Sequence, residues 1–202
     1  METKYIFVVR ILKPLDKAPT LKYNDPYLIP STSTRNKIGR AVWKLIYIAL
    51  FRPTPRPLHA WRAFLLRLFG AKIGENCHIY PRAQIWAPWN LNCEDVVTIA
   101  DEAVVYNPNS VHLESHAIVS QQAYLCGASH DIDDPTFKLV SGPICLKRFA
   151  WVCARATVLP NVTLHEGSVL ALSAVATHDL EPWTVYAGVP ARKLRLRNHK
   201  SA

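Results

Sequence analysis

An aliphatic or small residue recurs every six positions through the second half of the chain, and this period constrains the fold more than any other feature. Three shorter blocks upstream keep the same spacing. A period of six fits neither the 3.6 residues of a helical turn nor a long alternating strand. The recurring residues are Leu146, Val152, Val158, Leu164, Leu170 and Ala176, preceded by Ile73, Ile79, Ile85 and Leu91, then Cys93, Ile99 and Val105, then Leu113, Val119 and Leu125.

A second small or β-branched residue follows most of these positions by four, as Ala150, Ala156 and Ala174 do. We therefore expect a coil of short strands, in which each aliphatic residue points to the axis and each second residue lies at a corner. Three flat faces would close a triangular prism of about 18 residues per rung, with rungs at strand spacing. The period predicts an all-β coil.

The same region, roughly residues 71–195, resembles the hexapeptide-repeat acyltransferases. The resemblance rests on Ser129-His130-Asp131, on the turn from Ala171 to Thr177 with Asp179 after it, and on the run from Ala187 to Arg192. Within that superfamily the chain is similar to sugar O-acetyltransferases, above all those of colanic acid biosynthesis. This nearer similarity rests on Phe69 to Gly74, Pro88 to Leu91, Tyr106-Asn107, Ser120-Gln121 and Leu125-Cys126. The resemblance implies a left-handed parallel β-helix.

The chain departs from the family pattern at the second position of several hexads, where the family usually has glycine. If those corners needed a positive φ, a side chain there would lower stability. The substituted positions are Ala100, Glu114, Cys153, His165 and Ala171, and Asn161 replaces a further glycine in Pro160-Asn161-Val162.

The chain is expected to have three parts. Residues 1–70 form an N-terminal segment with two amphipathic helices, from about Ile38 to Phe51 and from Leu58 to Phe69, separated by a proline-rich stretch; a short strand is also expected at Tyr5–Leu12. Residues 71–186 form the β-helix, with an excursion loop at 131–143. Residues 187–202 form a basic C-terminal tail.

The formal net charge of +9 is unevenly distributed, because basic residues dominate 1–70 and 191–202 and acidic residues dominate 71–190. The N-terminal helices could cap the open end of the prism, or they could also rest on a membrane surface, since aromatic and basic residues alternate along them. Peripheral membrane contact through residues 38–69 therefore stays open. No motif points to nucleic acid.

The sequence favours a cytoplasmic enzyme, with a place at the inner membrane surface left open. No apolar run approaches the roughly 20 residues of a membrane span. Arg10 interrupts the one early apolar run, so a signal peptide is not expected. The five cysteines form no C-x-x-C pair and indicate free thiols in a reducing compartment.

Transfer of an acetyl group from a thioester to a sugar hydroxyl needs a base near neutral pKa, and histidine fits that need. The resemblance implies that His130 is this base, that Asn107 faces the acceptor beside it, and that transfer is direct. Asp131 and Trp151 are expected to contact substrate. Asp131 could equally cap a turn, Trp151 could equally serve packing, and Asn107 could instead be a ladder or turn asparagine.

The resemblance also implies acetyl-CoA as co-substrate, a glycan or sugar acceptor, and a homotrimer with acetyl-CoA between two prisms. Ala154, Leu172 and Thr177 fall at positions matching cofactor contacts. Arg192 and Arg195 would bind the phosphates through charge-assisted hydrogen bonds. The function expected is acetyl-CoA-dependent O-acetylation in exopolysaccharide or cell-surface glycan biosynthesis.

Three alternatives compete with this function. A zinc enzyme on the same fold needs converging histidines, but His112 and His116 are four residues apart and His130 has no histidine five residues away, so no metal is expected. A non-catalytic assembly scaffold and an N-acetyltransferase acting on an amino sugar both stay open, because a histidine base serves amines too.

Overall fold

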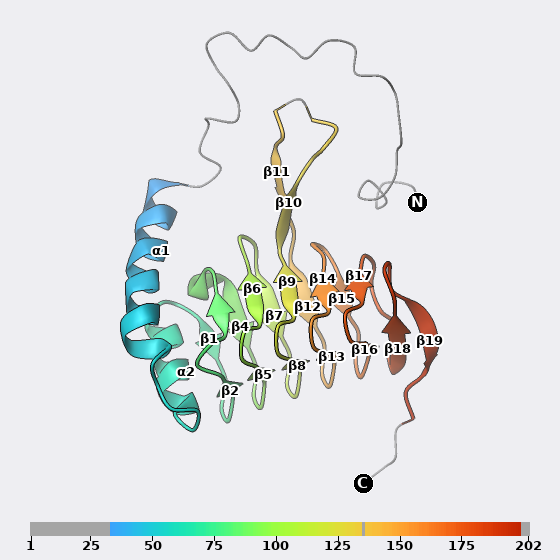
Figure 1. Ribbon diagram of the computed structural model, residues 1–202, viewed down its shortest axis with the longest axis horizontal. Coiled ribbons are helices and arrows are strands. Elements are labelled where there is room, and N and C mark those ends of the chain that lie inside the picture. The colour runs from blue at the N-terminus through green and yellow to red at the C-terminus, as the bar shows by residue number, and fades with distance from the viewer. Residues whose placement is uncertain (1–32, 135, 199–202) are drawn as a thin grey trace.

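The chain winds into a left-handed parallel β-helix with a helical segment at its first end. The computed structural model describes residues 33–134 and 136–198, so the strand expected at Tyr5–Leu12 lies outside the described residues. Figure 1 shows the rungs stacked along the long axis, the helices at one end and a hairpin projecting from the middle. The fold class predicted from the six-residue period is confirmed.

Three sheets, parallel except for their last strand β19, form the faces of the coil, and from β1 to β17 successive strands of the coil belong to successive sheets. The first sheet contains β1 (Lys72–Ile73), β4 (Leu91–Cys93), β7 (Val111–Leu113), β12 (Ile144–Leu146) and β15 (Thr163–Leu164). The second contains β2 (His78–Ile79), β5 (Thr98–Ile99), β8 (Ile118–Val119), β13 (Trp151–Val152), β16 (Val169–Leu170), β18 (Thr184–Ala187) and β19 (Arg192–Leu196). The third contains β3 (Gln84–Ile85), β6 (Val104–Tyr106), β9 (Tyr124–Cys126), β14 (Thr157–Val158) and β17 (Val175–Ala176).

The recurring aliphatic residues fill the axis of the coil, as the six-residue period predicts. In the second sheet Ile79 pairs in register with Ile99, which pairs with Val119, and the stack continues through Val152 and Leu170. All five side chains are fully buried. Burial of stacked aliphatic side chains, at about 25 cal/mol per Å² of apolar surface, is what holds adjacent rungs together.

At five corners the residue with a positive φ lies two positions after the position where the family usually has glycine. Each of the five substituted positions keeps a negative φ, so a side chain there causes no backbone strain. Asn161 does adopt a positive φ of 63°, which asparagine tolerates better than most residues. The left-handed residues that follow the five positions are Glu102, His116, Arg155, Gly167 and Ser173.

Two helices cover the first end of the coil. Helix α1 (Thr34–Ile46) begins four residues earlier than expected, where Ser33 caps it, and continues as the π-helix η2 (Tyr47–Phe51). Helix α2 (His59–Leu68) follows the prolines. The Trp43 indole N–H donates to the Ile85 carbonyl oxygen at 2.7 Å, which ties α1 to the coil. Among the described helices, none is long and apolar enough to cross a membrane.

The excursion expected at residues 131–143 begins three residues earlier and is a β-hairpin. Strand β10 (Ala128–His130) pairs antiparallel with β11 (Leu139–Ser141). At the base, the Gly142 amide donates to the Gly127 carbonyl oxygen at 3.1 Å. A Cβ on Gly127 would lie 2.6 Å from the Tyr106 carbonyl oxygen, so only glycine fits there.

The segment expected as a basic tail is largely ordered as an edge strand. Strand β19 (Arg192–Leu196) pairs antiparallel with β18 at the far end of the second sheet. Lys193 pairs with Glu181 in the preceding turn. The short 3₁₀ helix η3 (Pro88–Asn90) lies at the opposite end, between the third and first sheets.

Candidate active site

His130 lies in the first strand of the hairpin, opposite Leu139. Its Nδ1 atom is 2.6 Å from the Phe137 carbonyl oxygen. The imidazole also stacks on the Phe137 ring, with centroids 4.6 Å apart and planes 9° apart. Because a carbonyl oxygen can only accept, Nδ1 carries the proton in this contact. In the neutral form of the ring, the lone pair is therefore on Nε2.

Sequence reasoning missed Phe137, which holds His130 through both its ring and its carbonyl. Phe137 has a positive φ of 49°. Its amide donates to the Asp134 carbonyl oxygen at 2.8 Å, and the Asp131 amide donates to the Lys138 carbonyl oxygen at 2.9 Å. These bonds set the tip of the hairpin. The contact depends on how the hairpin closes, so no local pattern in the sequence signals it.

Asp131 follows His130 directly, and its carboxylate caps the turn. The Asp131 Oδ1 atom accepts the Asp133 amide at 3.0 Å. This is the local turn that short carboxylate side chains favour. The structure thus shows the turn-capping role that the sequence left open for Asp131.

Asn107 joins two neighbouring rungs through its side-chain amide. Its side chain is fully buried. The Oδ1 atom accepts the Ala87 amide at 2.9 Å, and Nδ2 donates to the Ala87 carbonyl oxygen at 2.8 Å. Both polar ends of the amide are therefore used to join neighbouring rungs. In the single chain this is the role of an asparagine that joins rungs, and the buried amide presents no exposed surface to an acceptor.

Three of the predicted contact residues lie on the second sheet and at its corner with the third. Trp151 is 39% exposed and its indole N–H donates to Ser120 Oγ at 2.8 Å. Ala154 offers its carbonyl oxygen to the Ser173 amide at 3.1 Å. Leu172 lies at the same corner, one rung on, and is 67% exposed.

The other predicted cofactor residues lie farther toward the C-terminal end. Thr177 directly follows β17, and its Oγ1 atom is 2.8 Å from His178 Nδ1. Arg192 and Arg195 are exposed on the edge strand β19. An Arg195 guanidinium nitrogen donates to the Leu196 carbonyl oxygen at 2.9 Å. Exposed guanidinium groups on a fixed strand suit phosphate binding.

A single chain does not gather all these residues around His130. The hairpin leaves the coil after β9, at the end of the third sheet, whereas Trp151 lies on the second sheet. Ala154 and Leu172 lie at the corner between those two sheets. The predicted residues thus lie on different sides of one prism.

The corner between the second and third sheets also carries a shallow hollow of about 450 Å³, which none of the predicted site residues lines. Polar side chains from successive rungs form a ladder along this corner. Arg82 pairs with Glu102 at 3.2 Å, and Gln122 bonds Glu102 at 2.8 Å and Arg155 at 2.7 Å. These groups satisfy one another and leave the hollow without an unpaired group from the ladder.

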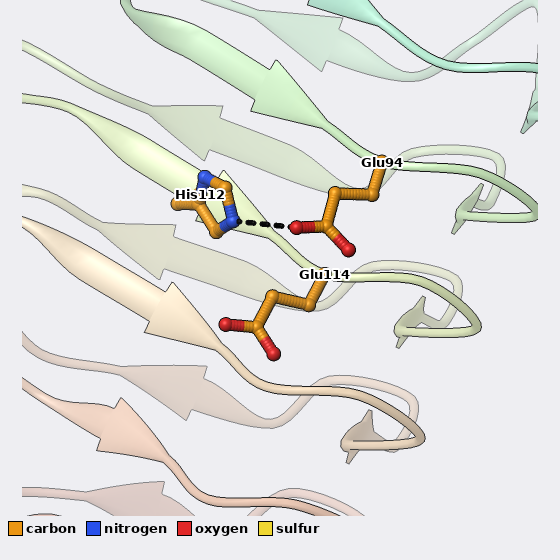
Figure 2. A group of neighbouring side chains, drawn as sticks. All are labelled: Glu94, His112 and Glu114. Carbon is orange, nitrogen blue, oxygen red and sulfur yellow. Dashed lines mark ion pairs between the residues drawn. The ribbon is translucent and has the colours of Figure 1, made fainter.

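On the first sheet, Glu94 lies on one rung and His112 and Glu114 lie on the next, with their ligand atoms within 4.8 Å of one another (Figure 2). His112 Nε2 is 3.4 Å from a Glu94 carboxylate oxygen. The Ser115 amide and hydroxyl both donate to Glu94 and hold the pKa of that carboxyl below its usual range. Lys147 Nζ is 2.6 Å from Glu114. A cation entering this cluster would have to displace Lys147, so the group is an ion-pair network.

Sequence comparison decides the family. The chain is 35% identical over 162 residues to the "Putative colanic acid biosynthesis acetyltransferase WcaF" of Escherichia coli strain K12, covering 80% of this chain and 89% of the relative. The chain belongs to the hexapeptide-repeat acetyltransferases. It is therefore an acyltransferase, as the resemblance of its motifs implies.

Solved hexapeptide-repeat structures share the fold. A maltose O-acetyltransferase from Clostridium difficile 630 superposes with a TM-score of 0.75 at 17% identity, over 83% of this chain and 90% of that one. A Vibrio cholerae O1 biovar eltor acetyltransferase complexed with acetyl-CoA also has a TM-score of 0.75, at 19% identity, over 85% and 93%. No family model matches the chain.

Proposed function

We propose that this hexapeptide-repeat acetyltransferase moves an acetyl group from acetyl-CoA to a hydroxyl of a sugar or glycan, in exopolysaccharide or cell-surface glycan synthesis. The observation that carries the proposal is the contact between His130 Nδ1 and the Phe137 carbonyl oxygen at 2.6 Å. It supports the tautomer in which Nδ1 carries the proton, so that the neutral imidazole has its lone pair on Nε2, as a general base needs. The family's relatives that act on sugars support the acceptor class.

The proposed reaction is a direct transfer within a ternary complex. Nε2 of His130 takes the hydroxyl proton as the sugar oxygen attacks the thioester carbonyl carbon. The tetrahedral intermediate then collapses, the carbon–sulfur bond breaks, and the departing thiolate of CoA takes the proton from the imidazolium. The histidine ends neutral, so the cycle needs no other co-reactant.

The proposal places acetyl-CoA in a groove between two copies of the chain in a homotrimer. The wide separation of the predicted residues on one prism supports this arrangement, because Ala154, Leu172 and Thr177 could meet the hairpin of a neighbouring copy. Trp151 would lie beside the substrate. Arg192 and Arg195 would bind the phosphates, and Asp131 would shape the acceptor end of the site through its turn.

Calorimetric titration with acetyl-CoA, combined with turnover on a panel of sugars, tests the proposed function. His130→Ala should lower turnover by ~10²–10⁴ while CoA affinity stays within a few-fold. The matched control is His165→Ala, which removes a half-buried imidazole from another corner and should retain turnover. Light scattering should give a mass of about three chains.

Each result has a defined meaning. Absence of CoA and acetyl-CoA binding in a folded protein would support a scaffold and end the proposal. Equal losses of turnover and CoA affinity in His130→Ala would make His130 structural. Faster acetylation of an amino sugar on nitrogen than of any hydroxyl would replace the O-acetyl proposal by the N-acetyl alternative.

A further inference from the structure

The two N-terminal helices leave a large apolar surface without a covering element from the described part of the chain. Its side chains are between 39% and 68% exposed. Helix α1 buries Trp43 and α2 buries Leu65 and Leu66 against the coil. The exposed apolar residues are therefore separate from those that pack the helices onto the coil. We name this surface the helical apolar face; it consists of Ile38, Val42, Leu45, Ile48, Leu50, Leu58, Trp61, Phe64 and Leu68.

The two parts of the helical apolar face meet where α2 contacts the end of η2. Ile38, Val42 and Leu45 are spaced four and three residues apart on α1, so they follow one side of it. The Trp61 indole N–H donates to the Leu50 carbonyl oxygen at 2.9 Å, which joins α2 to the end of η2. Trp61 also packs on Phe64, with ring centroids 5.7 Å apart. The indole is thus satisfied internally, and its apolar ring faces outward.

The charge around this face has one sign. No aspartate or glutamate occurs between residues 26 and 74. Arg35, Lys37, Lys44 and Arg52 are exposed around the face. Lys37 and Lys44 are seven residues apart and therefore lie on the same side of α1, next to the apolar stripe. The acidic residues of the chain are concentrated in the coil instead.

The exposed apolar side chains and the positive charge around them together indicate which partner the helical apolar face can bind. A second copy docked face to face would bring the same lysines and arginines together, which costs free energy. An anionic lipid surface accepts the apolar side chains and attracts the basic ones, and an amphipathic helix with these two features lies in the plane of such a surface. We propose that the helical apolar face binds an anionic lipid bilayer, with α1 and α2 lying in the interface.

Binding of this kind holds the chain at the bilayer surface through side chains alone. The apolar stripe enters the boundary between headgroups and acyl chains, and the long side chains of Lys37 and Lys44 reach the phosphates. The coil then stays in water with its acidic surface. The proposal does not depend on acetyl transfer, because none of the residues in the helical apolar face has a role in the proposed chemistry.

Co-sedimentation of the full chain with vesicles tests the proposal. One set of vesicles is phosphatidylcholine alone and the other contains about a third phosphatidylglycerol. We expect binding to the anionic set that weakens as salt rises. Leu45→Gln with Phe64→Gln should weaken it by about tenfold or more, and Leu196→Gln, an equally exposed residue on β19, should not. Lys37→Gln with Lys44→Gln should weaken binding to the anionic vesicles by about tenfold and leave neutral vesicles unaffected.

Other occupants would give other results, each of which overturns the proposal. If the wild-type chain does not sediment with anionic vesicles, the face does not bind lipid. If Leu45→Gln with Phe64→Gln lowers the mass measured by light scattering, the face joins copies of the chain. If the same pair lowers the unfolding temperature by several degrees without changing sedimentation, residues 1–32 cover the face. Calorimetry with CoA on the same variants tests the proposed enzyme function separately. CoA binding that persists while lipid binding is absent would overturn the lipid proposal alone.

Discussion

At the residue scale, the environment of His130 depends on Phe137 more than on any neighbour in sequence. The phenyl ring fixes the plane of the imidazole, and the carbonyl oxygen fixes the proton on Nδ1. Ring and carbonyl can be separated experimentally because asparagine adopts a positive φ with little strain. Phe137→Asn removes the ring and keeps the backbone turn.

We expect Phe137→Asn to lower turnover by about tenfold with an unchanged KM for acetyl-CoA, because the imidazole is held by one contact in place of two. Phe137→Tyr should keep the turnover of the parent protein, since tyrosine retains the aromatic ring. Steady-state kinetics of both variants measures this. Turnover unchanged in Phe137→Asn would show that the ring does not position His130, and an equal rise in KM would indicate a general disturbance of the hairpin.

At the scale of elements, the docking of α2 depends on one buried guanidinium group. Arg62 has no exposed surface. It donates to the Ile79 carbonyl oxygen at 2.6 Å on the coil and to the Pro55 carbonyl oxygen at 2.8 Å in the proline-rich turn. It also bonds Thr54 Oγ1 at 2.8 Å and the Arg56 carbonyl oxygen. One side chain therefore joins helix, turn and β-helix.

Replacing Arg62 by methionine should lower the free energy of unfolding by about 3 kcal/mol, because several buried carbonyl groups lose their donor. For a chain of this size that corresponds to a fall of roughly 6–12 °C in Tm. Arg52→Met, at an exposed position near the start of the same turn, should change stability by less than about 0.5 kcal/mol. Thermal unfolding followed by circular dichroism compares them, and equal effects would refute the special role of Arg62.

At the scale of the whole molecule, carboxylates that join rungs should make the fold sensitive to acid. Burial opposes ionisation of Asp101, but hydrogen bonds from the Arg56 guanidinium and the Arg82 amide outweigh it and lower the Asp101 pKa. The Glu94 pKa is lowered by Ser115. Groups with a lower pKa in the folded state stabilise it fully above their unfolded pKa of about 4, and lose that effect as pH falls through the folded value.

We therefore expect the contribution of these carboxylates to the unfolding temperature to be constant from about pH 7 to 5 and to be lost below about pH 4. Asp101→Asn should lower the unfolding temperature at neutral pH and flatten its decline in acid, because the titrating carboxylate is gone. Scanning fluorimetry across this pH range measures both curves. Parallel curves for the variant and the parent would mean that Asp101 contributes nothing to the acid response.

The core of the β-helix could be predicted because it depends on local spacing. Ile79, Ile99 and Val119 each occupy one of the buried positions that the six-residue spacing marks in the sequence, although these rungs take 20 residues and not the expected 18. The left-handed corner residues were not located, because the sequence shows a missing glycine but not which residue turns the chain. Glu102 turns the corner that Ala100 begins.

The site could be predicted only in part, because much of it rests on contacts between distant residues. The buried state of Asn107 follows from its bonds to Ala87, twenty positions away. The start of the hairpin at Ala128 follows from the closure of Gly127 on Gly142, which no hexad reveals. A repeat predicts the features that neighbouring rungs have in common. The bonds of Asn107 and the start of the hairpin are not common to neighbouring rungs, so the repeat does not predict them.

The hairpin has a consequence for how such enzymes diversify. Strands β7 and β12 pair in register directly, Val111 beside Ile144 and Leu113 beside Leu146, although the whole hairpin lies between them in sequence. The stack closes beneath the hairpin as if it were absent, so its length and sequence are decoupled from the rungs. Since His130 lies on β10, a lineage that exchanges this hairpin replaces the proposed base together with the loop around it. The β-helix would stay unchanged in such an exchange, while the proposed base and the loop around it would change together.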